Sequence, residues 1–231
     1  PVAIAFVVAN VVGTFVFFGG GLDGLKQLVE NSTDMIANFT LSPVPLFVLM
    51  GGLFFHTGLA KQVFDAFDKL MGRIPGRLSY LAVGGGTVFA ALTGSSLANA
   101  AMLGSLLTRE MQERRYKPHM SIGPILGVGG LAVIIPPSAI AVLLAGIANI
   151  DVGALLVAGL MPGLLIALLF IALITIQVRI DPDAAPSYEV QPLTGRKRMK
   201  LLFVDTLPIA IIIFSVVGMI IFGIATPTES A

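Results

Sequence analysis

Long uncharged segments alternate with short charged ones along this chain. A helix needs about 20 apolar residues to cross the roughly 30 Å hydrocarbon layer of a membrane. Six segments have about that length or more: residues 1–22, 35–55, 78–107, 120–150, 153–178 and 201–224, the last interrupted only by Asp205. The pattern predicts an all-α integral membrane protein with several transmembrane helices.

The composition agrees with a membrane location. Hydrophobic residues make up 56% of the 231 residues and charged residues only 12%, with a mean hydropathy of +0.95. Soluble domains carry about 25% charged residues, so much of the usual solubilising surface is missing. There is no Cys, which excludes disulfides and thiolate metal sites. The net charge of +1 gives no case for nucleic acid, and we expect the lipid bilayer as the surrounding partner.

The basic residues indicate how the segments are oriented. Short loops rich in Lys and Arg stay on the cytoplasmic side of the membrane. Two basic clusters flank residues 78–107, so this segment is expected to enter the membrane, turn at residues 93–96 and return. We therefore predict a re-entrant helical hairpin and five crossings elsewhere. All Lys and Arg residues except Lys26 fall into three clusters: Lys61, Lys69, Arg73 and Arg77; Arg109, Arg114, Arg115 and Lys117; and Arg179, Arg196, Lys197, Arg198 and Lys200.

The polar turn of this hairpin has the composition of a binding site. Gly94 permits the sharp chain reversal, and the last carbonyls before it lose their helical partners. Ser95 or Ser96 can cap the second half-helix, whose free N–H groups point to the same place. Asn99 adds an amide one turn further on. The alternative is close helix packing, since Gly and Ser are common where membrane helices touch; the three Gly residues at 84–86 are assigned that role.

Proline interrupts the segment 120–150. Pro136 and Pro137 have no N–H group to offer the preceding turn, and their rings disfavour a helix through this point. The sequence predicts partly released carbonyls over residues 129–133 and a free hydroxyl on Ser138. Neutral oxygens at membrane depth suit Na⁺, a hard ion that needs no buried carboxylate. The alternative is a plain proline kink.

Several motifs follow one another in the order found in one transporter family. The hairpin TGSSLANAAMLGSLL precedes REMQERRYKP, GGLAVIIPPS and LLVAGLMPGLLIALL, and the chain closes on ATPTE before its last two residues. This order resembles the large membrane subunit of the tripartite ATP-independent periplasmic (TRAP) transporters. Met161 is a mild departure, because the family usually has Leu before Pro-Gly at this place.

The resemblance implies a multi-pass protein of the bacterial inner membrane. It implies sodium-coupled import of an organic acid, either a carboxylate or a sugar acid, by an elevator-type mechanism. The implied partners are a periplasmic substrate-binding protein and a small membrane subunit. The family has two inverted repeats, each with a hairpin and a broken helix, and we expect this chain to hold the first of them and half of the sites.

These considerations assign the site residues and divide the chain. The predicted substrate-binding residues are Ser95, Ser96, Asn99 and Ser138, and the predicted sodium ligands are Gly94, Ser95, Gly129, Gly130, Leu131, Ala132, Val133 and Pro136. The predicted parts are N-terminal transmembrane helices (1–57, with residues 23–34 outside the membrane), an amphipathic interfacial arm (58–77), a transport region (78–178) with the re-entrant hairpin at 78–107 and the broken helix at 120–150, a cytoplasmic loop (179–200), and a transmembrane helix with the start of the second repeat (201–231).

Other classes of function fit the residues less well. An intramembrane serine hydrolase would need a base within hydrogen-bond reach of Ser95 or Ser96, and the two His residues, His56 and His119, lie at predicted membrane edges. We therefore predict no enzyme. A channel would favour charged pore rings or a carbonyl filter built from several copies, and a non-transporting scaffold subunit would not need two broken helices.

Overall fold

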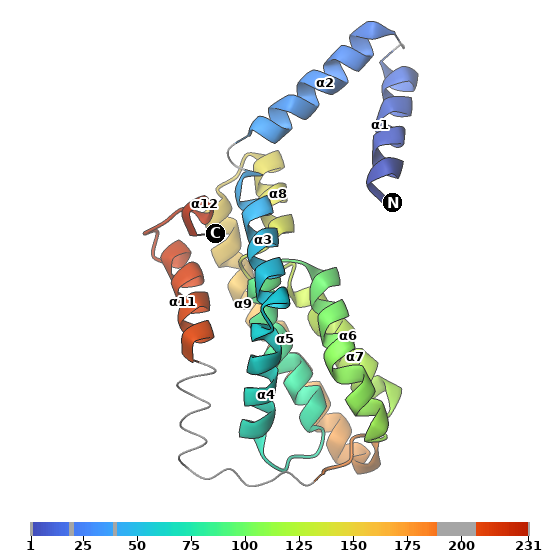
Figure 1. Ribbon diagram of the computed structural model, residues 1–231, viewed down its shortest axis with the longest axis vertical. Coiled ribbons are helices and arrows are strands. Elements are labelled where there is room, and N and C mark those ends of the chain that lie inside the picture. The colour runs from blue at the N-terminus through green and yellow to red at the C-terminus, as the bar shows by residue number, and fades with distance from the viewer. Residues whose placement is uncertain (1, 19–20, 39–40, 189–206, 231) are drawn as a thin grey trace. The chain divides into compact units, whose positions relative to one another are not determined.

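The computed structural model describes residues 2–18, 21–38, 41–188 and 207–230, and every regular element within these ranges is helical (Figure 1). The expectation of an all-α protein is confirmed. The chain divides into two units, Pro1–Ser42 and Pro43–Ala231, which we describe separately.

The first unit consists of two helices, α1 (Val2–Phe17) and α2 (Leu22–Ala37). They touch where Gly24 of α2 lies against α1, since a Cβ built on Gly24 would be 2.9 Å from Cγ2 of Thr14. Residues 23–34 were expected to lie outside the membrane, and no secondary structure was predicted for them. They are a regular helix, because apolar residues recur at helical spacing between the charges.

The second unit begins with α3 (Pro43–His56), which starts at a proline as helices often do. The apolar run at 35–55 therefore belongs to two helices. The remaining elements of this unit are α4 (Leu59–Met71), α5 (Arg77–Thr93), α6 (Ser96–Glu113), α7 (Pro118–Leu131), α8 (Ala139–Ala148), α9 (Val152–Ile180), a short 3₁₀ turn η2 (Pro182–Ala184), α11 (Leu207–Ile221) and α12 (Pro227–Ser230).

One described helix, α9, is both long and apolar enough to cross a membrane unaided. Most of its surface is exposed to the surroundings, as a lipid-facing helix requires. Four shorter apolar helical segments fall below that length: Ala3–Phe17, Pro43–Leu53, Ala139–Ala148 and Ala210–Ile221.

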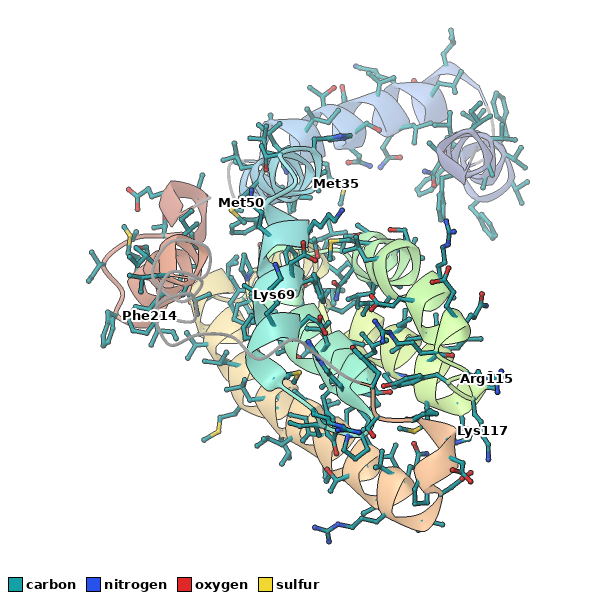
Figure 2. All side chains as sticks on the ribbon, turned by 60° about the horizontal axis from the view of Figure 1, so that its bottom comes forward. Met35, Met50, Lys69, Arg115, Lys117 and Phe214 are labelled. Atoms are coloured by element: carbon teal, nitrogen blue, oxygen red, sulfur yellow. The ribbon has the colours of Figure 1, made fainter. Side chains whose placement is uncertain are left out.

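The helices α5, α6, α7 and α9 form a bundle around the largest buried core (Figure 1). The starts of α5 and α7 lie together, because the Ser79 hydroxyl donates to the Met120 carbonyl. The end of α9 lies at the same level, where Tyr80 and Thr175 share a hydrogen bond of 2.8 Å. Thus α5 and α7 run in one direction, and α6 and α9 return. The exposed side chains of Arg115 and Lys117 mark the basic end of this bundle (Figure 2).

The predicted arm contains the helix α4, which packs on α5 through an aromatic ring. Phe64 lies against Gly85, where any Cβ would collide with the ring, and it stacks on Phe89 with 5.1 Å between ring centroids. A Cβ on Gly86 would likewise collide with Val128 and Leu103, at 2.6 and 2.8 Å. The expectation that the glycine run at 84–86 serves close packing is confirmed for Gly85 and Gly86.

The predicted loop at 179–200 begins slightly late, since α9 continues to Ile180. Residues 189–200 of that loop, and the first six residues of the predicted C-terminal part, lie outside the described residues.

Candidate functional site

The chain reverses between α5 and α6 at Gly94 and Ser95. Gly94 has φ +56°, a left-handed conformation that L side chains rarely adopt, and its N–H closes the last turn of α5 on the Ala90 carbonyl. Ser95 then caps α6, its hydroxyl accepting from the Ala98 N–H at 3.4 Å. Of the two serines proposed as caps, the structure selects Ser95.

The second interruption lies between α7 and α8. Helical turns continue past Leu131, with N–H groups up to Ile135 bonding the carbonyls of Gly129, Gly130 and Leu131. Those three oxygens, expected to be partly released, are thus engaged. Among the described residues, no donor bonds the carbonyls from Ala132 to Pro137. The released stretch therefore starts later than the sequence predicted, because hydrogen-bonded turns continue through Ile135 before the prolines end them.

Ser138 caps α8 just as Ser95 caps α6. Its φ and ψ are −124° and 118°, against −129° and 118° for Ser95, and its hydroxyl accepts from the Ala141 N–H at 3.2 Å. The sequence predicted a free hydroxyl here. That expectation is wrong, because the first turn of α8 needs an acceptor and Ser138 is the nearest one.

The two interruptions meet in space although they are some 40 residues apart. A Cβ built on Gly94 would lie 3.1 Å from the Pro137 carbonyl oxygen and 3.3 Å from the Ala139 nitrogen. Near the end of α7, a Cβ on Gly129 would lie 3.4 Å from the Ser96 carbonyl oxygen at the start of α6. The hairpin tip therefore rests directly on the broken helix.

This junction combines two kinds of polar group. The starts of α6 and α8 each present N–H groups without helical partners, which favour an anion. The end of α5 and the stretch before Ser138 present unengaged carbonyl oxygens, which favour a cation. A site for an anion beside a site for a small cation is what this geometry can provide.

The helix α9 holds the interrupted stretch in place from behind. A Cβ on Gly159 would lie 2.5 Å from the Ile134 carbonyl oxygen, and one on Gly163 would lie 2.6 Å from Cγ1 of Ile135. Our sequence analysis missed these two residues. Their four-residue spacing, common where membrane helices approach closely, was the available signal.

Asn99 lies behind the tip and not at its surface. It is fully buried, and its side-chain nitrogen donates to the carbonyls of Gly86 (3.2 Å) and Val128 (3.3 Å). It therefore ties α6 to both α5 and α7. Its Oδ1 has no hydrogen-bond partner within the described ranges.

A cavity of about 480 Å³ opens beside the tip, between α3 and α6. This size suits a small organic ligand. Of the predicted substrate-binding residues, only Ser95 lines this cavity. Ser96 follows it in the chain but is not among the lining residues, and Asn99 and Ser138 are buried. The lining residues are Val48, Gly51, Gly52, Thr93, Ser95, Ala98, Ala101, Met102 and Ser105.

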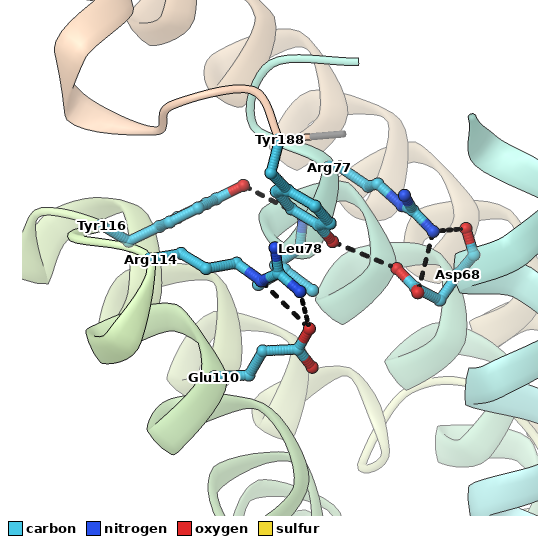
Figure 3. Close-up of polar contacts among 7 residues, drawn as sticks. All are labelled: Asp68, Arg77, Leu78, Glu110, Arg114, Tyr116 and Tyr188. Atoms are coloured by element: carbon cyan, nitrogen blue, oxygen red, sulfur yellow. Dashed lines mark hydrogen bonds and ion pairs between the residues drawn. The ribbon is translucent and has the colours of Figure 1, made fainter. Parts of the chain in front are cut away.

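A second polar cluster lies at the opposite, basic end of the bundle (Figure 3). Arg77, whose side chain is only 1% exposed, pairs with Asp68 of α4 at 2.8 Å. Tyr188 donates its hydroxyl to the same carboxylate at 3.3 Å, and the Arg114 guanidinium stacks 3.3 Å from the centre of its ring. These contacts join α4 and the ends of α5 and α6 to the segment after α9.

Burial governs the electrostatics of this cluster. Burial raises the pKa of the Asp68 carboxyl, and the neighbouring Arg77 only partly opposes it. Burial also raises the pKa of the Tyr188 phenol, with the Asp68 charge adding to the effect. The pair of Arg77 with Asp68 fixes the position of α4 against the start of α5.

Residues 181–188, which follow α9, also make backbone contacts with the starts of α5 and α7. We call residues 181–188 and their partners the clasp. The Gly76 N–H donates to the Ala185 carbonyl at 3.1 Å and the Lys117 N–H to the Ala184 carbonyl at 2.9 Å. The Lys117 ammonium also pairs with Asp181 and lowers the pKa of that carboxyl.

A helical hairpin whose tip meets a broken helix is the arrangement from which secondary transporters build sites inside a membrane. Comparison with known proteins defines the family. The whole chain, residues 1–231, matches the family described as "Tripartite ATP-independent periplasmic transporter, DctM component", and the chain belongs to that family. The expectation drawn from the motifs is confirmed.

Individual relatives have related names. The chain is 30% identical over 210 residues to the C4-dicarboxylate TRAP transporter large permease protein DctM of Pseudomonas aeruginosa (90% of this chain, 48% of that protein). It is 33% identical over 214 residues to the sialic acid large permease protein SiaM of Vibrio cholerae (90% and 48%). It is 29% identical over 232 residues to the isethionate permease protein DctMQ of Oleidesulfovibrio alaskensis (100% and 35%).

The chain spans about half the length of the large permease proteins it matches, and less of DctMQ. These relatives are named as permeases, which fits the expectation that the chain is not an enzyme. Membership of the family implies a multi-pass protein of the inner membrane.

Proposed function

We propose that this chain is part of the membrane subunit of a sodium-coupled importer of an organic acid. The observation that carries the proposal is the contact of Gly94 with Pro137 and Ala139, which brings two helix N-termini and two sets of free carbonyls together. Relatives named for C4-dicarboxylate, sialic acid and isethionate all carry a small organic acid in their names. A carboxylate or sugar acid is the corresponding substrate class here.

The hairpin formed by α5 and α6 is proposed to be re-entrant. Its uncharged parts run from Leu78 to Thr93 and from Ser96 to Leu107, so they reach about 18–24 Å into the membrane at 1.5 Å per residue. That is less than the roughly 30 Å of hydrocarbon. The interruption that the tip contacts lies against α9 at Gly159 and Gly163, partway along that helix. The five crossings are proposed to be made by α1, α3, the broken helix, α9 and α11.

The substrate anion is proposed to bind at the two serine-capped helix starts. The N–H groups around Ser95 and Ser96 and those after Ser138 supply donors without a buried arginine. Ser95 faces the cavity of about 480 Å³, which supplies the space. Asn99, engaged with two carbonyls, holds the tip in place from behind.

Sodium is proposed as the coupling ion, transported with the acid. The unengaged carbonyls before Ser138 include those of Ala132 and Val133 and are neutral oxygens. Among them, the Pro137 carbonyl lies against Gly94 at the end of α5. Such oxygens suit a hard monovalent cation. The carbonyls of Gly129, Gly130 and Leu131 already accept backbone hydrogen bonds, and that of Leu131 accepts two, from Ile134 and Ile135, so they are weaker candidates for the ion than the unengaged carbonyls that follow.

The elevator-type movement, the second inverted repeat and the two partners are proposed from the family. A periplasmic substrate-binding protein delivers the acid, and a small membrane subunit, separate or fused, completes the membrane part. The relative named DctMQ illustrates a single permease protein of greater length.

The test is uptake by the complete transporter in proteoliposomes, with its binding protein, using labelled dicarboxylates, sialic acid and isethionate. We expect uptake that requires both an inward Na⁺ gradient and the binding protein. The double variant Ser95→Ala, Ser96→Ala is expected to lose this uptake and to retain assembly. Proton-driven uptake would overturn the sodium assignment. No uptake with any ion, from folded and assembled protein, would favour a scaffold subunit; uptake that no gradient can drive uphill would favour a channel.

A further inference from the structure

The helix α2 carries an apolar stripe that α1, its partner in the first unit, does not cover. Leu22, Val29 and Ile36 recur every seven residues and are 85%, 63% and 87% exposed. Leu25 extends the stripe and is half-buried. Seven residues are nearly two full turns, so these side chains lie on one face.

The charged residues of α2 occupy a different face. Asp23, Glu30 and Asp34 are exposed there, and Lys26 forms an exposed pair with Glu30 at 3.8 Å. The contact with α1 uses a third face, around Gly24. Packing on α1 therefore leaves the apolar stripe open, and the helix is strongly amphipathic.

The covalent connections limit where α2 can lie. Residues 18–21 join it to α1 and residues 38–42 join it to α3. At about 3.5 Å per residue, each connection reaches only about 20 Å. If α1 and α3 cross the membrane as proposed above, both ends of α2 are held near the same membrane face, and a 16-residue helix cannot project away from it.

We infer that α2 lies in the plane of the membrane surface, on the side opposite the basic clusters, with Leu22, Val29 and Ile36 inserted into lipid. Interfacial helices of this kind bury their apolar face about 5–10 Å into the boundary between headgroups and acyl chains. The polar face, with charges of both signs, is then directed to water. The occupant of the stripe is lipid, because the bilayer is the apolar phase within reach of both helix ends. The inference rests on the proposed crossings of α1 and α3.

The test uses nitroxide labels on the complete transporter in lipid nanodiscs. This chain contains no Cys, so single substitutions Leu22→Cys, Val29→Cys and Ile36→Cys label unique positions within it once any Cys elsewhere in the transporter is replaced. The matched controls are Asp23→Cys and Glu30→Cys, one residue away on the polar face. The readout compares collision of each label with oxygen, which concentrates in lipid, and with a nickel chelate, which stays in water.

We expect the labels at Leu22, Val29 and Ile36 to report a depth of about 5–10 Å, and those at Asp23 and Glu30 to report water. Equal access of the nickel chelate at Val29 and Glu30 would overturn the inference. Protection of Val29 from both reagents would also overturn it, because the stripe would then be covered by protein. Uptake measured on the same samples separates this result from the proposed function, since a transporting protein with Val29 in water refutes only the interfacial helix.

Discussion

The α-carbon of Gly94, at the tip of the α5–α6 hairpin, faces the carbonyl oxygen of Pro137, which lies in the interruption between α7 and α8. A side chain starting at Gly94 would place its first carbon 3.1 Å from that oxygen. The tip and the broken helix are therefore in backbone-to-backbone contact, and each limits the position of the other.

Gly94→Ala is expected to disturb this contact in two ways. The left-handed φ of +56° costs a residue with a Cβ about 1–2 kcal/mol, and the methyl group must also displace the Pro137 carbonyl. We expect a lower melting temperature in detergent and loss of most uptake. Gly123→Ala is the control, because nothing lies within 4 Å of its Cβ position and alanine favours a helix. Equal behaviour of the two variants would contradict the contact.

Gly159→Ala tests the support that α9 gives to the interruption. The added methyl would lie 2.5 Å from the Ile134 carbonyl oxygen, so the stretch must move, at about 1–3 kcal/mol for overpacking. We expect reduced thermal stability together with weaker Na⁺ dependence of uptake. Leu165→Ala, at a 58% exposed position of the same helix, should change stability by less than about 0.5 kcal/mol. A Gly159→Ala protein with normal stability and Na⁺ response would show that the stretch is free to shift.

The comparison of sequence with structure shows which information is local. Gly94 and Ser95 were identifiable because a turn and a cap need particular residues at neighbouring positions. Pro136 and Pro137 likewise predicted that the helix is interrupted after α7. In contrast, the four-residue spacing of Gly159 and Gly163 signals a close approach but not the residue approached, because the contact of Gly159 with Ile134 depends on how two helices pass each other.

Residues 23–34 were only placed outside the membrane, with no structure assigned, although the period of Leu22, Val29 and Ile36 indicates a helix. One local expectation failed for a physical reason that can be named. The Ser138 hydroxyl was expected to be free because the proline break was considered without the start of α8. A helix start needs an acceptor, and the residue before Ala139 supplies it.

Asn99→Ala distinguishes a residue that holds the tip from one that binds substrate. Two hydrogen bonds, to the carbonyls of Gly86 and Val128, are lost, which should cost about 2 kcal/mol because both oxygens remain buried. We expect a lower melting temperature and an unchanged half-saturating substrate concentration in the folded fraction. Asn31→Ala, at an exposed position of α2, is the control. Normal stability with a raised half-saturating concentration would instead place Asn99 in contact with substrate.

Tyr188 is expected to act through its ring more than through its hydroxyl. Tyr188→Phe removes one half-buried hydrogen bond to Asp68 and should cost less than about 1 kcal/mol. Tyr188→Ala also removes the ring lying against Arg77 and Arg114, so we expect a loss of about 2 kcal/mol or more. Thermal unfolding in detergent measures both. Equal losses for the two variants would show that the hydroxyl carries the interaction.

Acid should open the clasp at Asp181 before it affects the rest of the bundle. The hydrogen bond from Lys117 lowers the pKa of the Asp181 carboxyl, so its contribution is present above the ordinary value of about 3.9 and is lost as pH falls through the lower folded-state pKa. Amide exchange at Lys117, whose N–H bonds the Ala184 carbonyl at 2.9 Å, reports this opening. After correction for intrinsic rates, its protection should fall as pH drops below about 4. Asp181→Asn should show lower protection that no longer depends on pH in this range, whereas exchange at Asn99, in the buried core of the hairpin, should be the same in both proteins. A pH-dependent loss that persists in Asp181→Asn would assign the acid sensitivity to another group.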